Sequence, residues 1–138
     1  MPMLSLRQLL HTAIWLKRHL RSELVVPELQ VLRRYLDPTD CVADAGAHGG
    51  AWSVPLSRLV PQGKVFAFDA LPYYADMLRS TLRLLKCRNV EVIGRPLLES
   101  ERDVEFVWRD PSGRRLKAVS HLRGTDEQVT DNVLRLQE

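Results

Sequence analysis

Between Val42 and Ser53 the sequence changes from an apolar run to a glycine cluster and then to a helical pattern. The apolar run ends in a carboxylate, Asp44, and a cluster of glycines follows it at positions 46, 49 and 50. Glycine adopts positive φ without a steric penalty, and a helix that begins after such a loop presents unpaired backbone N–H groups. The stretch therefore predicts a strand, a tight loop and a helix, with room for a ligand beside the loop.

A second acid follows a second predicted strand. Residues 64–68 (Lys-Val-Phe-Ala-Phe) lead directly into Asp69. In nucleotide-binding folds an acid at this place accepts hydrogen bonds from ribose hydroxyls. Because neighbouring parallel strands end at the same edge of a sheet, we expect Asp44, Asp69 and the glycine loop to converge on one crevice.

The loop composition narrows the choice of ligand. The dinucleotide fingerprint Gly-x-Gly-x-x-Gly, counted from Gly46, would need glycines where His48 and Ala51 stand. A phosphate-binding P-loop would need Lys followed by Ser or Thr where Ala51 and Trp52 stand. A carboxylate directly before the loop attracts a cation and repels phosphate. These residues favour S-adenosylmethionine, which is cationic and carries no phosphate, over a nicotinamide dinucleotide.

Together the two segments resemble the FkbM-type family of S-adenosylmethionine-dependent methyltransferases. The family's first motif is roughly Asp-x-Gly-Ala-(Asn/His)-x-Gly-x-x-Ser, its second is roughly Val-x-Ala-Phe-Glu-Pro-x-Pro, and the similarity covers residues 28–122. Here an Asp replaces the Glu of the second motif and an Ala replaces its first Pro; either acid can bind ribose. The resemblance implies that the methyl donor is bound by the residues at the motif positions, Asp44, Gly46, Ala47, His48, Gly50, Ser53, Asp69 and Ala70.

The expected roles differ along this set. We expect Asp44 to orient the methionine end of the donor, the small residues to give it backbone room, and Asp69 to bind the ribose. His48 is a candidate base by its ordinary pKa, although an orienting or structural role is favoured, so no catalytic residue is assigned. The Trp at position 52 either touches the ligand or fills the space between helix and sheet. The cysteine spacing predicts no metal site.

The family resemblance also implies an O-methyltransferase that acts on a small-molecule or glycan-type acceptor. The family continues into a fourth strand of the type Asp-x-Ile-Lys-Ile-Asp-x-Glu-Gly, and residues 1–138 do not reach such a segment. We therefore expect the donor-binding part of the enzyme, with the carboxyl-terminal half of the fold missing. The alternative is a non-catalytic domain that keeps the nucleotide fold for structure or assembly.

The fold class predicted is α/β, Rossmann-like, of the class I methyltransferase type, with parallel strands in the order 3-2-1. Apolar periodicity predicts helices over about 3–21, 27–36, 51–59 and 72–86, and strands over 41–44, 64–69 and 90–93. Residues 104–108 and 116–119 predict a β-hairpin around a turn at 110–113, and residues 124–138 a frayed helix. We expect an amino-terminal helical cap over 1–36 and the donor-binding domain over 37–138.

The first predicted helix is amphipathic and basic. Leucines at positions 6, 9, 10 and 20 share one side with Ala13 and Ile14, and no acid precedes Glu23. This pattern resembles a transit segment or a membrane-surface helix, but we expect it to pack as a cap on the domain or on a second copy. Lys17 and Arg18 interrupt it too early for a membrane span. His11 and His19 are expected at the helix surface or in packing.

The chain has a net charge of +3. Its Lys and Arg residues are spread along the predicted helices and form no concentrated basic patch in the sequence, which argues against nucleic-acid binding. The basic residues 114–123 are expected on a solvated strand face. Cys41 and Cys87 form no disulfide framework, and we expect free, mostly buried thiols in a cytoplasmic protein. Without a fourth strand, the far edge of the first strand would be open. We expect it to be covered by the amino-terminal helix, by the carboxyl-terminal segment or by a second copy in a homodimer.

Overall fold

The structure, a computed structural model, describes residues 4–21 and 28–97, Ser112 and the backbone of three short strands further on. The chain divides into two compact units, Met1–Gly94 and Arg95–Glu138. This division differs from the sequence-based one, which separated residues 1–36 from 37–138. The amino-terminal helix lies in the same unit as the glycine loop because it packs directly on that part of the chain.

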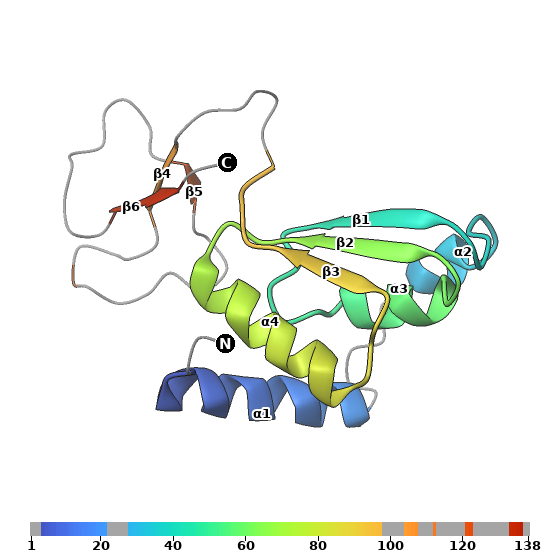
Figure 1. Cartoon of the computed structure of the whole chain (residues 1–138), viewed down its shortest axis with the longest axis horizontal. Helices are drawn as coiled ribbons and strands as arrows, with labels where there is room; N and C mark the ends of the chain where they lie inside the picture. Colours follow the sequence, from blue (N-terminus) through green and yellow to red (C-terminus); the bar gives the residue numbers. More distant parts are fainter. Residues whose placement is uncertain are drawn as a thin grey trace. The chain divides into compact units, whose positions relative to one another are not determined.

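The first unit is built on a parallel sheet of three strands, β1 (Cys41–Ala45), β2 (Lys64–Phe68) and β3 (Val90–Ile93). Their spatial order is β1-β2-β3, with β2 in the middle (Figure 1). Asp44 pairs with Ala67, and Phe68 pairs with both Ala45 and Ile93. The predicted Rossmann-like arrangement with strand order 3-2-1 is therefore confirmed for these three strands.

In the described part of the chain, the helices that accompany this sheet are α1 (Leu6–Leu20), α2 (Glu28–Leu32), α3 (Ser53–Leu59) and α4 (Pro72–Leu84). Figure 1 shows α3 and α4 on one side of the sheet and α1 beyond α4. Pro72 occupies the first turn of α4, where its missing N–H costs no hydrogen bond. Ser5 caps α1 through a reciprocal capping box with Gln8.

The hydrophobic core lies between the sheet and the helices α3 and α4. It consists of small and branched apolar side chains from both layers, Ala47, Val54, Leu56, Val60, Val65, Ala67, Leu78 and Leu82. Val65 and Ala67 alternate along β2 with side chains on the opposite face, as the two-residue period of a strand requires. This core fixes the ends of β1 and β2 beside the glycine loop.

On the opposite face of the sheet, residues 4–21 and 28–97 form no such core. Cys41, Ala43 and Ala45 are exposed there, whereas Val42 packs against the helix-side cluster. Cys41 was predicted to be mostly buried, and this is wrong because the alternation of β1 directs it away from the helices. Cys87 is half-buried, and neither cysteine forms a disulfide.

The second unit contains a small antiparallel sheet in the order β5-β4-β6. Its strands are β4 (Val104–Val107), β5 (His121–Leu122) and β6 (Val133–Leu136). A hairpin was predicted with residues 104–108 as its first strand and residues 116–119 as its second. The first strand is present as β4, and β5 pairs with it antiparallel. Residues 116–119 lie outside the described residues. A helix was predicted over residues 124–138. This prediction is wrong for Val133–Leu136, which form the strand β6 and pair with β4 along its whole length. A short polar helix is marginal by itself, whereas β4 supplies a hydrogen-bonding edge.

Within the first unit, the described part of the amino-terminal helix packs against α4 and does not pair with the far edge of β1, and covering of this edge by the carboxyl-terminal segment stays a prediction. β1 pairs with β2, α1 packs against α4, and β6 pairs with β4. Covering of this edge by a second copy stays a prediction. None of the helices found in residues 4–21 and 28–97 could span a lipid bilayer.

The core position of α4 can be tested with two leucines of the same helix. Leu78 is fully buried and Leu84 is 58% exposed. We expect Leu78→Ala to lower the free energy of unfolding by about 2–5 kcal/mol, because it leaves a cavity against Ala67 and Val54. Leu84→Ala should change it by less than about 0.5 kcal/mol. Urea unfolding measures both, and equal losses would contradict this packing.

Candidate functional site

The glycine loop after β1 is tied to the tip of β2 by three successive backbone N–H groups. Those of Gly46 and Ala47 both donate to the carbonyl oxygen of Phe68, each at 2.9 Å. The next, that of His48, donates to Oδ2 of Asp69 at 2.8 Å. The path requires positive φ at Gly46 (81°) and His48 (45°). Glycine adopts such angles freely, whereas His48 must be held there by its contacts.

Asp69 is a buried carboxylate whose two oxygens both accept backbone hydrogen bonds. Oδ2 accepts from His48, and Oδ1 accepts from the N–H of Leu71 at 3.0 Å. Burial raises the pKa of Asp69, these two hydrogen bonds oppose the rise, and the nearby charge of Asp44 adds to it. A carboxylate has about four lone-pair positions, so Asp69 keeps acceptor capacity beyond these two bonds.

Asp44 lies one residue before the end of β1 and is also buried. The hydroxyl of Ser53, in the first turn of α3, donates to its Oδ2. Burial raises the pKa of Asp44, and hydrogen bonds from the side chain and backbone of Ser53 partly oppose this rise. Asp44 and Asp69 are close enough that their like charges interact, as expected from the sequence.

Helix α1 covers part of the same loop. The indole of Trp15 lies against Gly49, where an added Cβ would come within 2.0 Å of Trp15 Cε2. Nε2 of His19 lies 3.0 Å from the carbonyl oxygen of Gly49, so this ring nitrogen donates the hydrogen bond. Burial lowers the pKa of His19, which favours the neutral ring. The space at Gly49 was expected to admit a ligand, and instead α1 fills it.

The other residues of the motif differ in how much free space lies beside their backbone. The space beside Gly50 is taken by Leu78, whose Cδ1 would lie 2.7 Å from an added Cβ. Ala47 is buried in the core. Gly46 is exposed, with no atom within 4 Å of the place of a Cβ. Ala70 is half-buried in the turn after Asp69. Of the three glycines in this loop, Gly46 is therefore the one with open space beside its backbone.

The ring of His48 is enclosed by aromatic side chains. Its centroid lies 4.1 Å from that of Tyr74 and 5.4 Å from that of Trp15. Burial lowers the pKa of His48, and the positive charges of His11 and Arg18 lower it further. These effects favour the neutral form of the ring. His48 therefore has a structural role in packing α1 and α4 against the loop. A contact between His48 and the methyl donor stays a prediction.

Helix α1, which was expected only as a cap, also contributes side chains to this site. The side chains that it directs to the loop and to α4 are polar or aromatic, at helical spacing: Gln8, Thr12, Trp15 and His19. The sequence pattern that could have predicted this contact is the row of polar and aromatic residues on the side of α1 opposite the leucines. His11 and His19 do serve packing, since His11 bonds to the Tyr73 hydroxyl at 2.9 Å and His19 to the loop.

Two further features narrow what the site can hold. Trp52, for which two roles were open, packs against the core cluster of Leu56, Val60 and Val65, so it fills space between helix and sheet. Within the described residues, no group of three or more His, Cys, Asp or Glu side chains could hold a metal ion.

No protein-family model matches this chain, and no curated protein sequence matches it significantly. Among solved structures it is similar to precorrin-6y C5,15-methyltransferase from Geobacter metallireducens GS-15, with 28% identity over 47% of this chain and 34% of that one. It is also similar to a SAM dependent methyltransferase from Aquifex aeolicus, with 29% identity over 66% of this chain and 44% of that one. Both TM-scores are 0.43, too low for the likeness to decide fold or function. The matched part is less than half the length of either structure.

The contact between α1 and the loop can be tested at Gly49. We expect Gly49→Ala to destabilise the protein by roughly 1–3 kcal/mol, because the new methyl group must displace the Trp15 indole. Combined with Trp15→Ala, the added cost of the methyl group should largely disappear in a double-mutant cycle. Gly94→Ala is the control, since its nearest contacts are at 3.4 Å. Additive losses at positions 15 and 49 would contradict the contact.

The raised pKa of Asp44 gives a pH-dependent prediction. Protonation of a carboxyl with a raised pKa stabilises the fold, and this contribution is lost as pH rises through the folded-state pKa. Asp44→Asn removes the buried charge and keeps an oxygen acceptor for Ser53. We expect the variant to have the higher Tm at pH 7, with the difference shrinking as pH falls toward the ordinary pKa of Asp. A variant less stable at pH 7, with a deficit that disappears in acid, would contradict this sign.

Proposed function

We propose that this chain is the donor-binding part of an S-adenosylmethionine-dependent methyltransferase. One observation carries the proposal: the interacting carboxyls of Asp44 and Asp69 stand at the ends of adjacent parallel strands, beside the exposed backbone of Gly46. In open α/β sheets, this carboxyl edge of the strands is where ligands bind. The motif residues that resemble the FkbM-type family surround the same point.

The electrostatics of the pair favour a cationic ligand. Both carboxyls are buried, and burial is the main cause of their raised pKa values. None of the ion pairs found within residues 4–21 and 28–97 involves either acid. A sulfonium or ammonium group nearby would offset the cost of two buried negative charges, whereas a phosphate would increase it.

The chemistry expected of this part of the chain is positioning. Methyl transfer from a sulfonium requires in-line attack on an intrinsically reactive methyl group, so holding the donor accounts for much of the protein's contribution. Asp69 would accept hydrogen bonds from the ribose, Asp44 would act on the methionine end, and Gly46 would admit the donor to the backbone. A hydroxyl acceptor, small molecule or glycan, follows from the family resemblance alone.

A structural role is the second candidate, and one feature favours it. The oxygens of Asp69 already accept hydrogen bonds from His48 and Leu71, and the spaces at Gly49 and Gly50 are filled by Trp15 and Leu78. The Asp69 carboxylate, which would bind the methyl donor, therefore also stabilises the conformation of the loop. A domain kept only for structure or assembly would show these contacts and bind no donor.

Calorimetric titration of the full chain with S-adenosylmethionine separates the two functions. We expect binding with a dissociation constant of roughly 1 μM to 1 mM, the usual range of enzyme KM values. Asp69→Asn should weaken this binding at least about tenfold, since hydrogen bonds to charged groups contribute roughly 1.5–3 kcal/mol. Glu91→Gln is the charge-matched control, because Glu91 is an exposed acid of β3 with only a surface ion pair.

Thermal unfolding of each variant distinguishes loss of binding from loss of the fold. No heat of binding at millimolar S-adenosylmethionine, from a chain that unfolds cooperatively, would overturn the donor-binding function and leave the structural one. Unchanged affinity in the Asp69→Asn variant would overturn the assignment of Asp69 to the ribose.

A further inference from the structure

Helix α1 turns its apolar side to solvent. The side chains by which it contacts α4 and the glycine loop include Gln8, His11, Trp15 and His19. The leucine side of the helix faces outward. The predicted cap on the domain is therefore formed, but through the side of the helix opposite to its hydrophobic stripe.

The outward side is unusually apolar for a protein surface. Five of the nine large hydrophobic side chains that are exposed in the described residues lie on α1: Leu6 (84%), Leu9 (51%), Leu10 (60%), Ile14 (46%) and Leu20 (70%). They recur at the spacing of one helical face. Single exposed leucines need no explanation, but a row of them along one helix marks an interaction surface. We call these five residues the outer face of α1.

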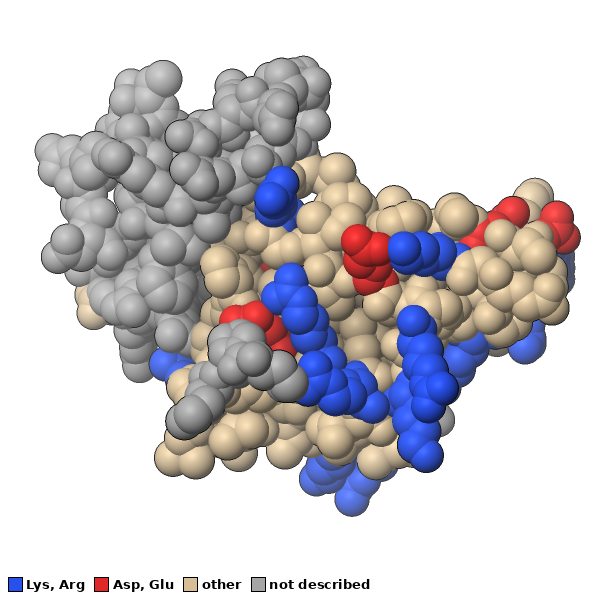
Figure 2. All heavy atoms as spheres, in the orientation of Figure 1, with Lys and Arg blue, Asp and Glu red and all other residues tan. Residues whose placement is uncertain are grey.

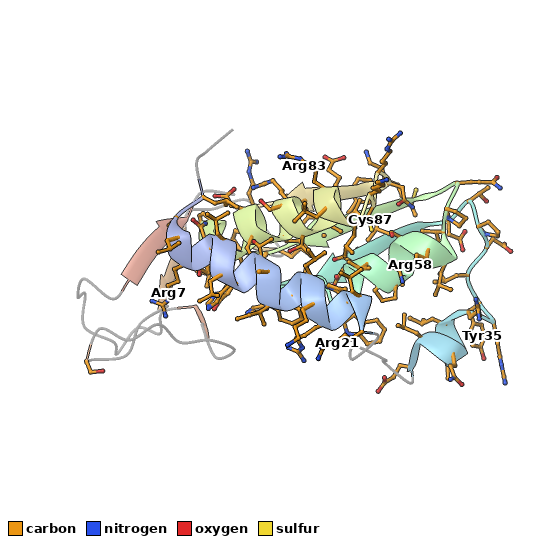
Figure 3. The ribbon with its side chains drawn as sticks, turned by 90° about the horizontal axis from the view of Figure 1, so that it is seen from below. Arg7, Arg21, Tyr35, Arg58, Arg83 and Cys87 are labelled. Carbon is orange, nitrogen blue, oxygen red and sulfur yellow. The ribbon has the colours of Figure 1, made fainter. Side chains whose placement is uncertain are left out.

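Cations accompany this face and acids are absent from the helix. Arg7 and Lys17 are exposed, and the first acid of the chain is Glu23, after the helix has ended. Figure 3 looks onto α1 from below and shows Arg7 near one end and Arg21 near the other. Figure 2 shows Lys and Arg side chains over the region where Figure 1 has α4, and a smaller group at the lower rim of the described surface, below the position of α1 in Figure 1. A surface that is both apolar and negatively charged would match these side chains.

We propose that the outer face of α1 docks on an anionic lipid surface. An amphipathic helix with leucines on one side and Lys or Arg beside them lies in the plane of the interface, with the leucines among the acyl chains and the cations at the headgroups. The long stem of Lys17 lets its ammonium group reach the headgroups. At 15 residues, α1 is about 22 Å long and lies on the bilayer, whose hydrocarbon core is about 30 Å thick.

A second copy of the chain fits this face less well. Two outer faces packed together would bring Arg7 and Lys17 of each copy into an interface that contains no acid from α1 to balance them. Like charges placed together suppress such pairing. An anionic bilayer supplies both an apolar interior and the opposite charge.

Docking would require no rearrangement of the described fold. Trp15 and His19 hold α1 on the loop with the leucines already directed outward. The outer face includes none of the residues assigned to the donor site, so lipid binding and donor binding can be measured independently. The inference does not depend on the proposed methyltransferase function.

Vesicle flotation of the full chain tests this proposal. We expect binding to vesicles of phosphatidylcholine mixed with phosphatidylglycerol, weaker binding in high salt, and little binding to phosphatidylcholine alone. Arg7→Glu with Lys17→Glu should weaken binding to the anionic vesicles at least about 25-fold, roughly fivefold for each cation lost. Leu10→Ser with Ile14→Ser should reduce it to near background, because the acyl-chain contact is removed.

Matched variants elsewhere on the surface serve as controls. Arg33→Glu with Arg34→Glu makes the same change in net charge at exposed positions after α2, and Leu84→Ser with Val31→Ser replaces side chains that are 58% and 57% exposed. Both pairs should bind anionic vesicles like the unchanged chain. No binding to anionic vesicles, equal losses in the control pairs, or a dimer that Leu10→Ser with Ile14→Ser converts to a monomer would overturn the proposal.

Discussion

The connection between the glycine loop and the tip of β2 is the constraint on which the rest of the first unit depends. Three consecutive N–H groups, from Gly46 to His48, donate to one carbonyl and one carboxylate at the end of the neighbouring strand. A loop that followed β1 by any other path would leave these donors without partners beside a buried carboxyl, which is costly. Parallel pairing of β1 with β2 brings donors and acceptors to the same edge.

This arrangement gives the site its electrostatic character. The same backbone donors that order the loop also stabilise the charge of Asp69, and Ser53 does so for Asp44. They do not fully offset burial, because the pKa values of both acids remain raised. The fold therefore keeps two buried acids close together at a cost in stability.

Helix α1 completes the loop from outside. Trp15 needs a glycine at position 49 to reach the backbone, and His19 satisfies the carbonyl of that same residue. These contacts give Gly49 a structural reason to be a glycine. Because the polar and aromatic side of α1 packs against the rest of the protein, the leucines on the other side face solvent.

Much of the fold followed from local patterns. The apolar runs that end at Asp44 and Asp69, the glycines between the first strand and its helix, and Pro72 at a helix start predict the three strands, their order and the connecting helices. These features are visible in sequence because strand alternation, helix spacing and turn residues each involve only near neighbours. The segment at 133–136 was assigned wrongly because its partner, β4, lies far away in the chain.

The amino-acid sequence by itself determined that two acids and a glycine loop meet at one edge of a parallel sheet, since strand direction and strand order are enough to bring them there. Only the tertiary structure decided which loop positions remain open, which side of α1 packs inward and that Cys41 is exposed. These outcomes depend on which surfaces meet. A leucine stripe shows that a helix has an apolar side, but the neighbour that this side meets is set by the shape and polarity of the surface beneath, here the backbone at Gly49 and the ring of His48.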